Sequence, residues 1–318
     1  MNEKIALLPL AALCIALSGC HGAKIPAPPV AKPAEPVEAS LPAYILPNTE
    51  VREITSGPLG RTYQLFVSLP PSYEERVTHR FPVLFVTDAS YAFPLVRNIG
   101  LMVGDRGKGL EEFVLIGLSY AKGETGQYSR RRDYTPTPNS EDTVSDMPGR
   151  PAVHGQAEVY RRFIADEVFP LVAESYRVDM NRKIFAGHSY GGLLGAHILL
   201  TEPTMFERYI LSSPSLWFDD KVMLARERAY SAAHTDMRAD VFLSIGAFET
   251  VNPSSGNKRY HRNKDMVRDL RTFEAQLRSR SYPSLRVEAT VIDDEDHLTV
   301  YPAAITRGLM WALPAAGH

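Results

Sequence analysis

The chain has 318 residues, of which 44% are hydrophobic, and these are enough to bury the core of one sizeable α/β domain. Its formal net charge at pH 7 is −2, so there is no excess of lysine and arginine to neutralise the phosphates of a nucleic acid. The composition therefore predicts a globular protein without a nucleic-acid partner.

A short apolar run lies at the start of the sequence. Lys4 is followed by apolar residues 5–17, which are too few to span a bilayer but match the core of a signal peptide. The letters LSGC at 17–20 resemble a bacterial lipobox, which implies cleavage before Cys20 and acylation of its thiol. We therefore expect residues 1–19 to be a lipoprotein signal peptide, with a plain secretory signal as the alternative. Because His21 stands where an aspartate would signal retention at the inner membrane, the expected location is the outer membrane, facing the periplasm.

Neither of the two cysteines is expected to take part in catalysis. Cys14 leaves with the signal and Cys20 carries lipid, so we expect no disulfide, thiolate metal site or cysteine nucleophile. Residues 20–47 are rich in proline and alanine, which is typical of an extended, solvated tether. The folded catalytic domain is predicted over 48–314.

The remaining chain alternates predicted strands and helices. Strands at Val51–Thr55 and Tyr63–Leu69 flank a glycine-proline turn and predict an antiparallel hairpin. Later strands are predicted at Phe81–Asp88, Phe113–Leu118, Ile184–Ala186, Tyr209–Ser212, Val241–Gly246 and Arg286–Ile292, and helices at Pro94–Val103, Gln156–Tyr176, Leu193–Leu200, His261–Arg280 and His297–Trp311. This order predicts a doubly wound, mostly parallel sheet that binds ligands beyond the carboxyl ends of its strands. The polar segment 121–150 has no convincing strand and is interpreted as a long loop.

The sequence GHSYG at 187–191 indicates the chemistry. An apolar strand precedes it and a helix follows, which is the context of the nucleophile elbow in α/β hydrolases. The serine of an elbow takes a strained backbone conformation, for which Gly187 and Gly191 leave room. We predict Ser189 as the nucleophile and interpret His188 as a packing residue that points away from the Ser189 hydroxyl.

A serine nucleophile needs a base and an orienting acid, which this fold supplies later in the chain. His297 follows the last predicted strand and is the predicted base, whereas His261 lies in a basic run and is interpreted as solvated. The acid is expected just after the strand 241–246, where Glu249 is the first carboxylate. A Ser/His dyad without an acid is an alternative. So are the carboxylates next to the predicted base, which are Asp293, Asp294 and Asp296.

Two backbone amides are expected to hold the oxyanion of the tetrahedral intermediate. One is the amide of Tyr190, at the start of the helix after the elbow. The second is expected from residues 88–91, which follow the strand that ends at Asp88.

Four segments together resemble the esterase D-like branch of the α/β hydrolases, which includes siderophore esterases that open catecholate trilactones. They are FPVLFVTD at 81–88, GHSYGG at 187–192, SSPSLW at 212–217 and DHLTV at 296–300. The resemblance spans residues 51–311 and implies that Ser189, Glu249 and His297 are nucleophile, acid and base. It also places the amides of Ser90 and Tyr190 at the oxyanion hole, although the family often has glycine where this chain has alanine at position 89.

The same resemblance implies contacts with the substrate. Trp217 looks like the family's site-wall tryptophan, with core packing as the alternative. Arg130, Arg131 and Arg132 resemble a segment that reaches the cleft, where guanidinium groups bind an anionic substrate through charge-assisted hydrogen bonds. A solvated loop is the alternative for these arginines.

The expected function is that of a serine esterase that hydrolyses carboxylic esters through an acyl-enzyme, with neither a metal nor an organic cofactor. The resemblance implies a siderophore ester such as a catecholate lactone as the substrate. The alternatives are an acyltransferase of the mycolyltransferase kind, a general carboxylesterase for acetyl or feruloyl esters, and a non-catalytic ligand-binding lipoprotein.

Overall fold

The computed structural model describes residues 43–139 and 144–315. The chain divides into the units Met1–Ile45 and Leu46–His318, and the second unit contains every element discussed below. The predicted signal peptide, Cys20 and residues 20–42 of the predicted tether lie outside the described residues. The predicted domain boundary at residue 48 stays a prediction.

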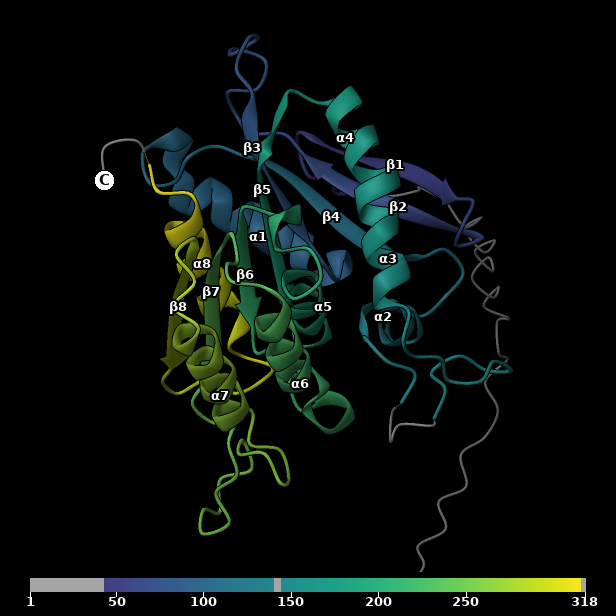
Figure 1. Cartoon of the computed structure of the whole chain (residues 1–318). Coiled ribbons are helices and arrows are strands. Elements are labelled where there is room, and N and C mark those ends of the chain that lie inside the picture. Colours follow the sequence, from purple (N-terminus) through teal and green to yellow (C-terminus); the bar gives the residue numbers. More distant parts are fainter. Residues whose placement is uncertain (1–42, 140–143, 316–318) are drawn as a thin grey trace, which may run out of the picture. The chain divides into compact units, whose positions relative to one another are not determined.

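The second unit is built on an eight-stranded sheet with the order β1-β2-β4-β3-β5-β6-β7-β8 (Figure 1). Its strands are β1 (Thr49–Ser56), β2 (Arg61–Ser68), β3 (Phe81–Val86), β4 (Val114–Ala121), β5 (Val178–His188), β6 (Arg208–Ser212), β7 (Ala239–Gly246) and β8 (Leu285–Ile292). The pairs β1/β2 and β2/β4 are antiparallel, and every other neighbouring pair is parallel. The predicted α/β-hydrolase fold, with a mostly parallel sheet and an antiparallel N-terminal hairpin, is confirmed.

Helices cover both faces of this sheet (Figure 1). They are α1 (Ala89–Gly104), α2 (Gly126–Tyr134), α3 (Ala157–Phe163), α4 (Phe169–Ser175), α5 (Tyr190–Leu199), α6 (Phe218–Ala233), α7 (Met266–Ser279) and α8 (Tyr301–Ala312). Helices α1 and α8 pack on one face against Leu84 and Val86 of β3, whereas Val83 and Phe85 belong to the larger core on the other face. Because side chains alternate along a strand, a sheet buried on both faces needs the continuous apolar runs seen in the sequence.

Several helices begin at residues other than those predicted. Helix α1 begins at Ala89 instead of Pro94, so this proline lies inside the helix rather than at its first turn. Helix α7 begins at Met266 instead of His261, because the Asp265 side chain accepts a hydrogen bond from the Arg268 amide and caps the helix there. Helix α8 begins at Tyr301 instead of at residue 297.

The helix predicted over 156–176 is interrupted by a π-helical turn at Ile164–Val168 between α3 and α4. The amide of Phe169 bonds to the carbonyl of Ile164, and Pro170 follows in the first turn of α4. A proline has no amide proton and clashes with the preceding turn, so the wider turn accommodates it.

The segment 121–150, interpreted as a loop, contains helix α2. Thr125 caps the helix by accepting a hydrogen bond from the Tyr128 amide. The buried face of α2 includes Ser129, Arg132 and Asp133. The hydrophobic pattern missed this helix because its buried face is largely polar.

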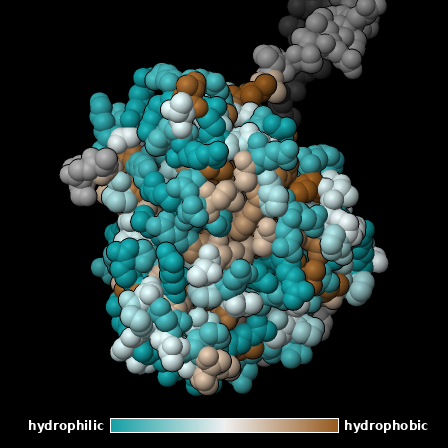
Figure 2. All heavy atoms as spheres, turned by 45° about the horizontal axis from the view of Figure 1, so that its top comes forward, coloured by the Kyte–Doolittle hydropathy of each residue, from teal (hydrophilic) through white to brown (hydrophobic). Residues whose placement is uncertain are grey.

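Hydrophilic side chains dominate the face seen in Figure 2, and apolar side chains interrupt them in separate groups. Within the ranges 43–139 and 144–315, none of the helices combines the length and the apolarity needed to cross a bilayer.

Candidate active site

Ser189 lies between the end of β5 and the start of α5, with φ 59° and ψ −117°. The glycines on either side are required by the close approach of neighbouring atoms. A Cβ atom on Gly187 would lie 2.4 Å from the backbone of Gly191, and one on Gly191 would lie 2.2 Å from the Thr87 hydroxyl oxygen. The strained bend therefore has the geometry of a nucleophile elbow.

The structure brings Ser189, His297 and Glu249 together at the carboxyl ends of the parallel strands. The Nε2 atom of His297 lies 2.9 Å from Ser189 Oγ, and its Nδ1 atom lies 2.6 Å from Glu249 Oε2. With Nδ1–H donating to the carboxylate, Nε2 is free to accept the serine proton. The three groups thus form a continuous chain of two hydrogen bonds, although the serine and the histidine are 108 positions apart.

The Glu249 side chain is completely buried, and its second oxygen is also held. Oε1 accepts hydrogen bonds from the Ser213 hydroxyl at 2.6 Å and from the Gly246 amide at 2.9 Å. Ser213 has a left-handed φ of 42°, so its backbone is strained where it supplies this donor. Sequence reasoning missed Ser213, although it belongs to the SSPSLW segment used for the resemblance.

His188 precedes the nucleophile and is buried beside the base. Its Nε2–H donates to the backbone carbonyl of His297 at 3.0 Å, and its Nδ1 accepts from the Ser212 hydroxyl at 3.1 Å. Burial holds the pKa of His188 well below its ordinary value, so the ring is neutral and suits this pattern of one donor and one acceptor. His188 therefore anchors the backbone of the predicted base, a role more specific than the packing role expected from the sequence.

His261 does not lie on a solvated helix, so that interpretation was wrong. Its ring is half-buried, and its centroid lies 6.0 Å from that of His297 in an edge-to-face arrangement. The His261 amide bonds to the carbonyl of Thr250, and a parallel backbone bridge joins His261 to Val251. The sequence around position 261 is basic and does not indicate that the chain comes back to the candidate site there.

The two predicted oxyanion amides lie in the first turns of helices. Tyr190 is the first residue of α5, and Ser90 is the second residue of α1. Asp88 precedes α1 in the left-handed conformation, with φ 55°, and its buried carboxylate accepts from the Tyr120 hydroxyl at 2.7 Å. The hydrogen bond between Tyr120 and Asp88 therefore stabilises the turn that precedes Ser90.

The three predicted substrate-binding arginines lie on helix α2 and differ in their surroundings. Arg130 forms a two-pronged ion pair with Asp88, at 2.9 and 3.2 Å, and its guanidinium carbon lies 5.2 Å from the centre of the Tyr190 ring. Arg130 is therefore beside the site, but its charge is balanced by an internal carboxylate. Arg131 pairs with Asp146 at 2.7 Å.

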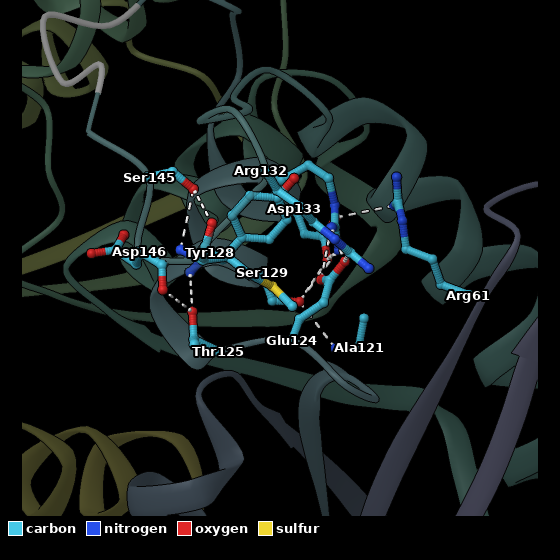
Figure 3. A network of polar contacts seen from close by, with 12 residues as sticks. Arg61, Ala121, Glu124, Thr125, Tyr128, Ser129, Arg132, Asp133, Ser145 and Asp146 are labelled. Atoms are coloured by element: carbon cyan, nitrogen blue, oxygen red, sulfur yellow. Dashed lines mark hydrogen bonds and ion pairs between the residues drawn. The ribbon is translucent and has the colours of Figure 1, made fainter.

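Arg132 is buried, and its predicted contact with substrate is corrected by the structure. Its guanidinium pairs with Glu124 at 2.7 Å and with Asp133 at 2.8 Å. Figure 3 shows these carboxylates converging on Arg132, with Arg61 reaching Asp133 from the side. Because the side chains of Arg132 and of both its carboxylate partners are buried, Arg132 stabilises helix α2 and does not face the cleft.

Trp217 is half-buried and lies next to the residue that follows the nucleophile. Its ring centroid is 6.1 Å from that of Tyr190, and the ammonium nitrogen of Lys264 lies 3.0 Å from the tryptophan ring centre. These three residues and Asn139 help to line a cleft of about 1090 Å³. Trp217 therefore stands at the wall of a cleft and is not enclosed in the core.

Comparison with known proteins identifies the family. The model of the esterase family described as "Putative esterase" matches residues 56–290, which is more than half of the chain. The chain belongs to this family. The esterase is 29% identical over 279 residues to the "Ferri-bacillibactin esterase BesA" of Bacillus subtilis, covering 86% of the chain and 93% of the relative. It is 31% identical over 220 residues to the "Siderophore enterobactin esterase" of Emericella nidulans, covering 62% of the chain and 71% of the relative.

Solved structures show the same fold. The crystal structure of the BES protein from Bacillus cereus has a TM-score of 0.69 at 24% sequence identity, covering 86% of this esterase and 98% of that chain. The siderophore hydrolase EstA from Aspergillus nidulans has a TM-score of 0.67 at 23% identity, covering 85% and 97%. Family membership makes this chain a carboxylic ester hydrolase, as predicted.

Proposed function

We propose that this esterase hydrolyses siderophore esters, with Ser189 as nucleophile, His297 as base and Glu249 as orienting acid. The observation that carries the proposal is the pair of contacts made by the His297 ring, 2.9 Å from Nε2 to Ser189 Oγ and 2.6 Å from Nδ1 to Glu249 Oε2. The substrate class is supported by relatives whose names describe ferri-bacillibactin and enterobactin esterases.

The reaction takes place in two steps on these three residues. As Ser189 Oγ attacks the ester carbonyl, His297 Nε2 accepts the hydroxyl proton, and Glu249 stabilises the imidazolium that results. The proton then passes to the leaving alkoxide, which leaves an acyl-enzyme. Water hydrolyses the acyl-enzyme in the reverse manner, with His297 again as base. In both steps the amides of Tyr190 and Ser90 hold the oxyanion.

The cleft lined by Tyr190, the residue that follows the nucleophile, favours an aromatic, anionic acyl group such as a catecholate. Trp217 offers an aromatic ring for stacking, and Lys264 places a positive charge 3.0 Å from the centre of that ring. A catecholate bound to iron is both aromatic and negatively charged, so it complements this pair, while the four aspartates that also line the cleft (Asp219, Asp220, Asp265 and Asp269) oppose an anion elsewhere in it. Arg130 lies beside the site with its charge paired to Asp88.

The test compares hydrolysis of a ferric catecholate trilactone with that of a simple p-nitrophenyl ester, each followed by chromatography of the products. The wild type is expected to open the trilactone, and Ser189→Ala is expected to lose roughly 10⁴-fold or more of both rates while it keeps the wild-type thermal transition. Residual turnover near the wild-type rate would remove Ser189 from its role. Hydrolysis of the simple ester alone would leave the catalytic roles standing and refute the substrate class.

We also propose that acyl chains on Cys20 hold the protein in the cell envelope, at the outer membrane facing the periplasm. The proposal is supported by the apolar run 5–17 followed by LSGC at 17–20. The full chain, expressed in a bacterium with two membranes and fed an alkyne fatty acid, is expected to carry the label in the outer-membrane fraction. Cys20→Ser is expected to carry none, and an unlabelled wild-type protein would refute the anchor.

A further inference from the structure

A third side chain, that of His261, lies close to two members of the proposed catalytic triad, Glu249 and His297. Glu249, His261 and His297 each offer one ligand atom, and these atoms all lie within 4.8 Å of one another. Imidazole nitrogen and carboxylate oxygen are the ligands that Zn²⁺ prefers together with thiolate. The mechanism proposed above uses Glu249 and His297 but gives no task to His261.

The position of His261 opposite His297 is fixed by the fold. The backbone bridge to Val251 returns the chain to the segment that follows Glu249. Arg259, two residues earlier, pairs with Asp296 at 2.7 Å and with Asp294 at 2.8 Å, both on the loop that carries His297. The two histidines therefore belong to loops that are joined by ion pairs.

The site combines a buried anion with two imidazoles that an ion can approach. The Glu249 side chain has no exposed surface, whereas the side chain of His297 is 25% exposed and His261 is half-buried. Burial lowers the pKa of His261, which leaves its ring in the neutral form that binds metals. Lys264 opposes a cation here, and Asp296 favours one.

We propose that a divalent transition-metal ion, Zn²⁺ in the first instance, binds between His261, His297 and Glu249 and reversibly inhibits this esterase. Zinc bonds of about 2.1 Å place tetrahedral ligand atoms about 3.4 Å apart. The His261 ring must therefore approach the other two groups by at most roughly 1.4 Å, and His297 Nδ1 and Glu249 Oε2, now 2.6 Å apart, must separate by roughly 0.8 Å. Rotation of a half-buried side chain on a loop provides a movement of this size.

The ion inhibits by changing the tautomer of the base. In the free enzyme the Nδ1–H of His297 donates to Glu249, and Nε2 faces Ser189 with its lone pair. When Zn²⁺ occupies Nδ1, the single proton of the neutral ring moves through solvent to Nε2. The ring then presents N–H to the serine and cannot accept its proton. No bond of the substrate is formed or broken in this step.

The ligand set also predicts which ions act. Mg²⁺ and Ca²⁺ require several oxygen ligands, and this site offers a single carboxylate with two nitrogens. Zn²⁺, Ni²⁺ and Cu²⁺ bind imidazole well. Inhibition is therefore expected from the second group and absent from the first at equal concentration.

The experiment measures initial rates on a simple ester while Zn²⁺ is titrated into chelator-treated enzyme, with each variant referred to its own metal-free rate. The wild type is expected to lose activity and to regain it with EDTA, whereas Mg²⁺ has no effect. His261→Ala and the larger His261→Gln are each expected to raise the half-inhibitory zinc concentration about tenfold or more. The matched control is His234→Ala, because His234 is an exposed histidine stacked on Tyr230, and it is expected to keep the wild-type sensitivity.

A second measurement does not depend on turnover, because the inhibition rests on the catalytic roles proposed above. Calorimetry with ZnCl₂ is expected to give one strong site in the wild type and in Ser189→Ala, and a weakened site in both His261 variants. If Ser189→Ala binds zinc but the wild type hydrolyses no ester, the metal site stands and the catalytic proposal falls. Zinc sensitivity or zinc binding that is unchanged in the His261 variants overturns the metal site, as does a wild type that zinc neither inhibits nor binds.

Discussion

The hydroxyl of Ser213 is expected to stabilise the fold through the buried Glu249 carboxylate, and Ser213→Ala tests this. The hydroxyl donates a 2.6 Å hydrogen bond to Glu249 Oε1. In the variant this oxygen loses that donor and keeps only the Gly246 amide. A hydrogen bond to a charged group contributes about 1.5–3 kcal/mol, and both partners here are buried. We therefore expect the free energy of unfolding to fall by about 2 kcal/mol, which corresponds to roughly 4 °C in Tm for a domain of this size.

Urea denaturation followed by circular dichroism measures this loss. The matched control is Ser231→Ala, since Ser231 bonds to a carbonyl on the exposed side of helix α6 and is expected to change stability by less than about 0.5 kcal/mol. In the Glu249→Gln background the acceptor is neutral and the bond weaker, so the cost of Ser213→Ala is expected to shrink by about 1 kcal/mol. Equal costs in both backgrounds would refute the assignment of the Ser213 contribution to the carboxylate.

Three further predictions follow from other contacts. Gly191→Ala places a Cβ atom 2.2 Å from a neighbouring hydroxyl oxygen and is expected to reduce ester hydrolysis at least about tenfold by shifting the elbow; an unaltered rate would contradict the steric reading. Arg132→Met leaves the buried Asp133 carboxylate without its main partner and is expected to cost about 3–5 kcal/mol in urea denaturation, whereas a loss below about 1 kcal/mol would refute a structural role. The hydrogen bond from Arg161 lowers the pKa of Glu158 from 4.5 to about 2, so the folded state binds its proton less readily than the unfolded state. The resulting stability is present above pH 4.5 and is lost as the pH falls towards 2. With allowance for a partly exposed carboxylate, Glu158→Gln is expected to cost about 1–2 kcal/mol at pH 7 and little near pH 2; an equal cost at both values would exclude the linkage.

The fold and the central residues of the candidate site were open to prediction because each has a local signature. Continuous apolar runs marked the parallel strands, and the glycine spacing around Ser189 marked the elbow. His297 and Glu249 were found from their positions just past strand ends, where a parallel sheet collects its functional groups. Because the parallel strands are neighbours in the sheet, these positions at their carboxyl ends could be expected to lie close together before any contact was known.

The missed features depend on contacts between segments far apart in the chain. Helix α2 buries ion pairs instead of apolar side chains, so its pattern resembled that of a loop. His261 lies among basic residues that suggest exposure to solvent, and backbone contacts with Thr250 and Val251, earlier in the sequence, place it at the site. Ser213 carries no sign of its partner in the sequence. The charge of Arg132 likewise suggested an anionic ligand because its internal carboxylates are invisible before folding.

His188, the last residue of β5, and Ser189, which follows it, both contact His297. One contact is to the backbone of His297 and the other is to its ring. His188 holds the carbonyl of His297, and Ser189 meets the imidazole. The end of β5 and the elbow thus fix both the attacking oxygen and the backbone of the base, and Arg259 of segment 250–265 adds ion pairs to the loop that carries His297. For protein engineering, a loop transplanted into this segment to alter substrate preference should therefore keep an arginine at position 259, so that the serine and the histidine stay aligned.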